Sequence, residues 1–141
     1  MLLLLLMATL SADPAESMSV RKSTRNMAYC VQSQIAQLDD GISDARTVAE
    51  GAMAACGGAR GLLRRVWTRA VDDLAEKAAR KSGEMVSDAD KSTLVEEAMA
   101  KLDASLQENS VRWVLQKRAA QAGSEKAAEQ PLTSNGPSWS D

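Results

Sequence analysis

The fold is decided by residues 30–56, which read CVQSQIAQLDDGISDARTVAEGAMAAC. Gly41 stands in a polar segment and suits the left-handed backbone conformation that ends a helix. Ser43 can cap the helix that follows. Because apolar residues recur at helical spacing on both sides of this segment, the sequence predicts two helices joined by a short turn. We expect the first helix at residues 19–40 and the second at residues 44–55.

The two cysteines, Cys30 and Cys56, lie at similar distances from this turn. At a rise of about 1.5 Å per residue, they are about 15 and 20 Å away from it along their helices. An antiparallel hairpin would therefore bring both thiols to nearly the same level. The small residues of the second helix, among them Ala45, Ala49 and Ala52, permit the close approach that a disulfide requires. We expect a structural disulfide if the chain is exported, and two buried free thiols if it stays in the cytosol.

The amino-acid composition favours helices. Hydrophobic residues make up 45% of the 141 residues, and they include one Tyr and no Phe. The remaining apolar residues, mainly Ala, Leu, Val and Met, suit helices better than strands, which prefer β-branched and aromatic side chains. The three prolines, Pro14, Pro131 and Pro137, lie in the terminal segments and leave the middle of the chain uninterrupted. The sequence thus predicts an all-α protein.

The second half of the chain predicts two further helices. Gly57 and Gly58 are expected to end the second helix, and a third helix with a regular apolar stripe follows at residues 60–81. Gly83 is expected to end this third helix. A fourth helix, capped by Ser87 or Asp90, is expected to run to about residue 120. The result is a four-helix arrangement with short connections.

The two ends of the chain differ from its middle. The first ten residues read MLLLLLMATL, a run too short to cross a bilayer as a helix, which needs about 20 residues. The run matches the apolar core of a secretory signal peptide, although no Lys or Arg precedes it. We expect a signal peptide at residues 1–12, a helical domain at 13–120 and a disordered tail at 121–141. The alternative for the first segment is a helix that packs against the core.

A basic stripe opens the third predicted helix. Arg60 and Arg64 are four residues apart, as are Arg65 and Arg69, so each pair shares a helix face. Such a stripe can bind the phosphates of nucleic acid or of anionic lipid. The other interpretation is a solvated face balanced by the acidic residues that follow. The net charge of −2 at pH 7 favours this second interpretation, so nucleic acid is not the partner that we expect.

The sequence offers no pattern of catalytic or metal-binding residues. It contains no His, the commonest general base and metal ligand, and two Cys alone cannot complete a zinc site. Asp39, Asp40 and Asp44 cluster in the first turn, but they lack the spacing of a calcium loop and suit turn and cap chemistry. The phosphate-binding glycine loop and the nucleophile elbow are absent. We expect no enzymatic activity, no cofactor and no metal.

The segment between the cysteines resembles a pattern in small uncharacterised exported proteins of Gram-negative bacteria. The pattern is C…A-x-L-D-D-G-x-S-D-A…V-A…C. The residues that meet it here are Cys30, Ala36, Leu38, Asp39, Asp40, Gly41, Ser43, Asp44, Ala45, Val48, Ala49 and Cys56. The resemblance covers only residues 30–56. It implies export and a helical hairpin, and it carries no activity with it.

These observations predict a small non-enzymatic helical protein of the bacterial periplasm or the extracellular space. Its expected partner is a protein or another component of the cell envelope, and no transmembrane span is expected. The alternative is a cytosolic accessory protein that binds nucleic acid through Arg60, Arg64, Arg65 and Arg69. The two hypotheses differ in compartment, and therefore in the expected state of the two thiols.

Overall fold

The computed structural model describes the backbone of residues 14–128 and the side chains of residues 18–125. Within this range the chain forms four α-helices and no strand: α2 (Pro14–Leu38), α3 (Ala45–Ala55), α4 (Gly57–Ser82) and α5 (Asp88–Ala128). The predicted all-α, four-helix architecture is therefore confirmed. The predicted signal peptide at residues 1–12 lies outside the described residues, as do residues 129–141 of the predicted tail.

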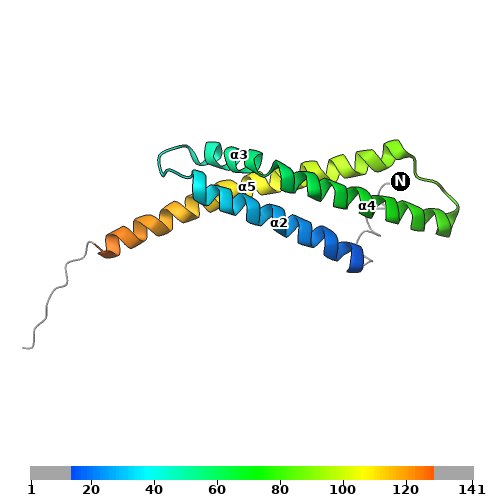
Figure 1. The fold of residues 1–141 in the computed structure, drawn as a ribbon, viewed down its shortest axis with the longest axis horizontal. Helices are drawn as coiled ribbons and strands as arrows, with labels where there is room; N and C mark the ends of the chain where they lie inside the picture. Colours follow the sequence, from blue (N-terminus) through cyan, green and yellow to red (C-terminus); the bar gives the residue numbers. More distant parts are fainter. Residues whose placement is uncertain (1–13, 129–141) are drawn as a thin grey trace, which may run out of the picture.

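The helices form an elongated bundle (Figure 1). α3 and α4 follow one another end to end, with only Cys56 between them. α2 lies alongside both of them and is antiparallel to them, and α5 runs in the same direction as α2. The C-terminal part of α5 extends beyond the other helices. Because α2 and α5 each pack against both α3 and α4, the buried apolar residues form one continuous core.

The core consists of small and medium-sized apolar side chains. α2 contributes Met27, Val31 and Ile35, which recur every four residues and therefore share one face. Residues of the other helices pack against them, namely Val48 and Ala52 of α3, Leu63 and Val71 of α4, and Leu94, Met99, Leu106 and Val114 of α5. Burying a large apolar side chain stabilises a fold by about 1.5–3 kcal/mol. This burial holds the helices together.

The turn between α2 and α3 is shaped by an aspartate and a glycine. The Asp40 carboxylate accepts hydrogen bonds from the backbone N–H groups of Ile42 at 2.9 Å and Ser43 at 2.7 Å. Gly41 has a φ of 76°, the left-handed conformation predicted for it. α2 ends at Leu38, two residues before the predicted end, because the chain at Asp40 has already entered this hydrogen-bonded turn.

The cap of α3 is Asp44, so the prediction that Ser43 caps this helix was wrong. The Asp44 carboxylate accepts hydrogen bonds from the N–H groups of Arg46 at 3.0 Å and Thr47 at 3.2 Å. The hydroxyl of Ser43 instead donates to the Asp40 carboxylate at 2.7 Å. A carboxylate is also the better cap electrostatically, because its charge faces the positive end of the helix dipole.

Gly57 and Gly58 do not end a helix, contrary to the prediction, but begin α4. Cys56 lies at φ −92° and ψ 20°, close enough to helical geometry that its carbonyl still accepts a hydrogen bond from the N–H of Arg60 at 3.0 Å. A glycine inside a helix costs about 1 kcal/mol relative to alanine. The packing of α3 and α4 against the same neighbours offsets this cost and keeps the break to a single residue.

The ends of α4 and α5 follow local sequence signals. Gly83, at φ 73°, ends α4 as predicted, and its N–H donates to the carbonyl of Ala79 at 2.8 Å. The hydroxyl of Ser87 accepts from the N–H of Asp90 at 3.1 Å and caps α5. α5 continues to Ala128, so the predicted helix end at residue 120 was too early. The segment beyond residue 120 is rich in Ala and Glu and contains no proline before Pro131, which explains why it continues the helix.

A disulfide joins Cys30 to Cys56, as predicted, and its Cα atoms are 6.0 Å apart. Cys30 lies in α2, and Cys56 lies in the junction between α3 and α4, where it is 1% exposed. The bond closes a loop across 26 residues that contains the whole α2–α3 turn. The prediction that the two thiols lie at the same height along the hairpin is therefore confirmed.

Replacing both cysteines by alanine (C30A/C56A) is expected to lower the free energy of unfolding by about 3 kcal/mol, because the unfolded chain regains the freedom of a loop of this length. Urea unfolding followed by circular dichroism measures the change. The wild-type protein treated with a thiol reductant should unfold like the double variant. Unchanged urea resistance in the double variant would contradict the prediction.

Candidate functional site

Two of the four arginines in the predicted anion-binding stripe face α5. Arg60 Nε donates to both carboxylate oxygens of Asp103 at 3.0 Å, and this pair is partly buried. The hydrogen bond to Asp103 raises the pKa of the Arg60 guanidinium. Arg64 Nη2 donates to Oε2 of Glu96 at 3.0 Å. Arg60 and Arg64 therefore bind carboxylates of their own chain and connect α4 to α5.

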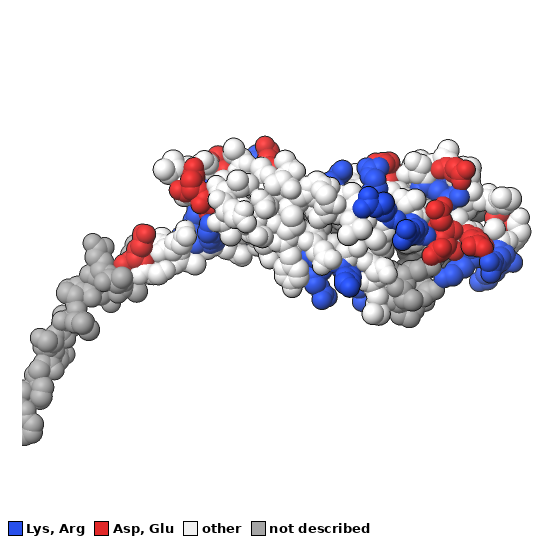
Figure 2. Space-filling model, viewed as in Figure 1, with Lys and Arg blue, Asp and Glu red and all other residues white. Residues whose placement is uncertain are grey.

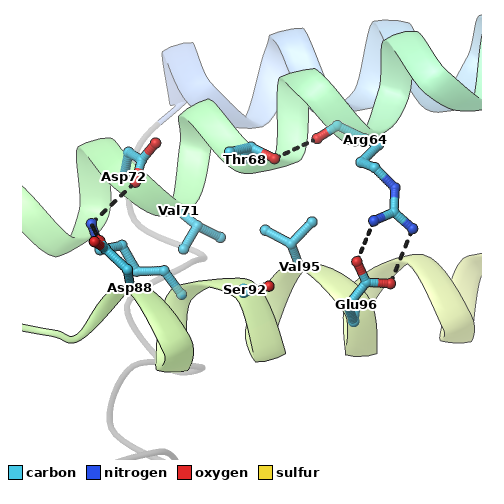
Figure 3. A pocket seen from close by; sticks show the side chains of 9 residues that line it. Arg64, Thr68, Val71, Asp72, Asp88, Ser92, Val95 and Glu96 are labelled. Carbon is cyan, nitrogen blue, oxygen red and sulfur yellow. Dashed lines mark hydrogen bonds and ion pairs between the residues drawn. The ribbon is translucent and has the colours of Figure 1, made fainter.

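A groove lies between α4 and α5 beside these pairs (Figure 3). Val71 and Val95 point toward one another across its floor, and charged side chains stand around it. Arg64 is paired with Glu96, and Lys91 Nζ lies 2.8 Å from Asp88 Oδ1. Lys91 Nζ also lies 3.4 Å from Oδ1 of Asp72. Each cation that lines the groove thus has a carboxylate partner, which leaves the groove without a strong attraction for an anion.

The other two arginines of the predicted stripe, Arg65 and Arg69, are exposed on α4. Neither forms an ion pair with another residue that the structure describes. They lie on the side of α4 away from the α5 pairs, because residues 65 and 69 are turned by about 100° from residues 64 and 68. The structure therefore divides the stripe into two arginines that bind α5 and two that face solvent.

α2 carries further cations that the sequence analysis did not single out. Arg21, Lys22 and Arg25 are all exposed, and residues 18–38 contain no Asp or Glu. Figure 2 shows Lys and Arg atoms without neighbouring Asp or Glu atoms over α2, whereas over α4 Lys and Arg atoms lie beside Asp and Glu atoms. The signal in the sequence was this run of residues without a carboxylate, which we interpreted only as part of a helix.

A buried carboxylate anchors the α2–α3 turn to α5. The side chain of Asp39 is 1% exposed, and its Oδ1 accepts from Arg118 Nε at 2.9 Å and Nη2 at 2.6 Å. Its Oδ2 lies 3.4 Å from Lys117 Nζ. Arg118 also donates to the carbonyl of Ser43 at 2.7 Å, on the other side of the turn. Asp40 and Asp44 have the turn and cap roles that the sequence analysis favoured, whereas the tertiary role of Asp39 was missed.

These contacts change the acidity of the turn. The hydrogen bond from Arg118 is the largest influence on Asp39 and lowers the pKa of its carboxyl, against the opposing effect of burial. The hydrogen bonds from the backbone and hydroxyl of Ser43 lower the pKa of Asp40 to about 2. Both carboxyls are therefore ionised in the folded protein at neutral pH.

Three observations bear on other classes of site. Within the described residues, no group of three or more His, Cys, Asp or Glu side chains is placed to hold a metal ion. None of the described helices is long and apolar enough to cross a membrane. Comparisons of the chain with protein-family models, curated proteins and solved structures gave no match.

Asp39→Asn is expected to lower the free energy of unfolding at pH 7 by about 2–3 kcal/mol, because Arg118 would lose a buried carboxylate partner. Asp73→Asn, which changes an exposed carboxylate on α4, serves as the control and should stay within about 0.5 kcal/mol of the wild type. Urea unfolding measures both. Equal effects of the two substitutions would show that the Asp39 contacts do not stabilise the fold.

The pH dependence of unfolding provides a second measurement on these variants. A carboxyl whose pKa is lower in the folded chain than its usual value of 3.8 stabilises the fold above that pH. This contribution is lost as the pH falls through the folded-state pKa. Wild-type stability should therefore decline as the pH is lowered below about 5, and Asp39→Asn should decline less steeply.

Arg60→Gln is expected to lower the free energy of unfolding by about 1 kcal/mol, because a partly exposed ion pair with α5 is lost. Arg65→Gln and Arg69→Gln should change it by less than about 0.5 kcal/mol. Thermal and urea unfolding of the three variants test this division. If all three variants lost the same stability, Arg65 and Arg69 would have a structural role.

Proposed function

We propose that the chain is a non-catalytic binding module that works in an oxidising compartment outside the bacterial cytoplasm. The observation that carries this proposal is the disulfide between Cys30 and Cys56. Structural disulfides persist in secreted and periplasmic proteins, whereas the glutathione pool of the cytosol keeps thiols reduced. Cys56 is buried in the core, so the bond is part of the packed bundle.

The ion pairs of the bundle support a binding role. Asp39 with Arg118 and Arg60 with Asp103 fix the helices relative to one another, which keeps the outer surface in one arrangement. Arg65 and Arg69 remain open to solvent. A surface whose helices are already fixed binds a partner without first having to order those helices.

The open charges favour an anionic partner. A component of the cell envelope suits the proposed compartment, since many of its molecules carry phosphate or carboxylate groups. The second candidate is a nucleic acid in the cytosol, and the exposure of Arg65 and Arg69 is the observation that favours it. Arg60 and Arg64 contribute less to either role, because they already bind Asp103 and Glu96.

Expression of the full gene in a Gram-negative host, followed by fractionation and intact-mass measurement, tests the compartment. We expect the protein in the periplasmic or extracellular fraction, shortened at its N-terminus, with a mass that increases by two hydrogens on reduction. The matched control is C30A/C56A, which should be exported without that increase. A cytosolic protein that keeps Met1 and has two alkylatable thiols would contradict the proposal.

A further inference from the structure

We infer that the solvent face shared by α2 and the first half of α4 docks on an anionic phospholipid surface. This inference rests on the proposed function and names the component of the envelope. We call this surface the α2–α4 basic face and define it by Lys22, Arg25 and Tyr29 of α2 and by Leu62, Arg65 and Arg69 of α4. All six side chains are exposed.

The two helices present the same pattern to solvent. Residues 22, 25 and 29 and residues 62, 65 and 69 both follow the spacing i, i+3, i+7, which places each set along one face of its helix. On α2 this face lies opposite the buried Met27 and Val31. On α4 it is turned by about 100° from the groove residues Arg64 and Thr68. Each set holds two cations and one large apolar residue.

The disulfide brings part of one set level with part of the other. α2 packs against α4 and runs in the opposite direction. Counting eight residues back from Cys30 reaches Lys22, and counting eight residues forward from Cys56 reaches Arg64. Both positions are about 12 Å along the helices from the disulfide. Lys22 and Arg25 are therefore level with the turn of α4 that contains Leu62 and Arg65.

The six residues that define this face include four cations and no acidic residue. Its four cations form no ion pair with another described residue. α2 has no acidic residue in positions 18–38, and the first acidic residue of α4 is Asp72. The four cations, which include the Lys and Arg atoms over α2 in Figure 2, therefore complement a negative surface outside the protein. Each Lys or Arg near an anionic membrane strengthens binding by about fivefold.

The apolar side chains of the face favour a membrane over a nucleic acid. Tyr29 is 62% exposed and Leu62 is 45% exposed, and Met18, four residues before Lys22, is 68% exposed. At a membrane, exposed aromatic and aliphatic side chains can enter the boundary between headgroups and acyl chains while Lys and Arg bind the headgroups. Phosphate backbones would use the cations alone, and Tyr29 is the only aromatic residue of the face available for base stacking.

Vesicle cosedimentation tests this inference with the protein as recovered from its host. The probes are vesicles of phosphatidylcholine, alone and mixed with phosphatidylglycerol. We expect binding to the mixed vesicles only, and weaker binding as salt rises. R65E/R69E and K22E/R25E should each weaken binding by at least about twentyfold.

The control R46E/K101E reverses two exposed cations on α3 and α5 and gives the protein the same net charge as either face variant. It should weaken vesicle binding by less than about threefold, since charges beyond a Debye length are screened.

The variant Y29S/L62S removes the two large apolar side chains of the face, and it should weaken vesicle binding equally at low and high salt. The stability of every variant is first measured by urea unfolding, and only variants as stable as the wild type are tested for binding. If a double charge reversal destabilises the protein, the two single reversals are tested instead.

Three results would overturn the inference. The first is that the protein does not bind anionic vesicles at low salt. The second is that R46E/K101E weakens vesicle binding as much as the face variants do. The third is that the protein binds duplex DNA tightly but does not bind vesicles. The last result would instead support the nucleic-acid candidate. The mass measurement of export is independent of lipid binding. If the protein is exported and oxidised but does not bind vesicles, the inference of a lipid-binding face is wrong and the proposed compartment still holds.

Discussion

The disulfide between Cys30 and Cys56 fixes the register of α2 against α3 and α4, and the short helix α3 depends on it most. α3 has only 11 residues, and isolated helices of that length are marginal in water. Its C-terminal end is held by the disulfide. Its N-terminal end is held by the turn that Asp39 and Arg118 anchor to α5. The hairpin is thus secured at both ends by tertiary bonds, which the local helix propensity of α3 could not replace.

α4 separates its arginines by function through helix geometry. Arg60 and Arg64 lie toward α5, where they bind Asp103 and Glu96, whereas Arg65 and Arg69 are turned away from these pairs and form no ion pair with another described residue. Residues that are adjacent in sequence, such as Arg64 and Arg65, therefore have different surroundings, because successive side chains are turned by about 100°. A count of arginines in the sequence does not reveal this division. The location of α5 decides it.

Local signals were sufficient to predict most of the fold, and long-range contacts were not. The helical period of the apolar residues, the left-handed Gly41 and the level of the two thiols act within one hairpin, so the sequence could reveal them. The ion pair between Asp39 and Arg118 joins residues 79 positions apart, and no local pattern marks it. Gly57 and Gly58 gave the wrong signal because tertiary packing overrode their weak helix propensity. The basic residues of the candidate site were predicted on α4 alone, since their neighbours on α2 become neighbours only in the folded bundle.

The clustering of Lys22, Arg25, Arg65 and Arg69 opposes folding, because like charges on adjacent helices repel one another. The chain readily places carboxylates against cations elsewhere, as in the pairs between α4 and α5. A carboxylate within one helical turn of Lys22 or Arg25 would reduce this repulsion, yet residues 18–38 contain none. The disulfide holds the two helices together against this repulsion and keeps their cations level. We infer from this cluster a role in binding, and the exposed Tyr29 and Leu62 within it fit the proposed lipid surface, which is anionic at its headgroups and apolar beneath them.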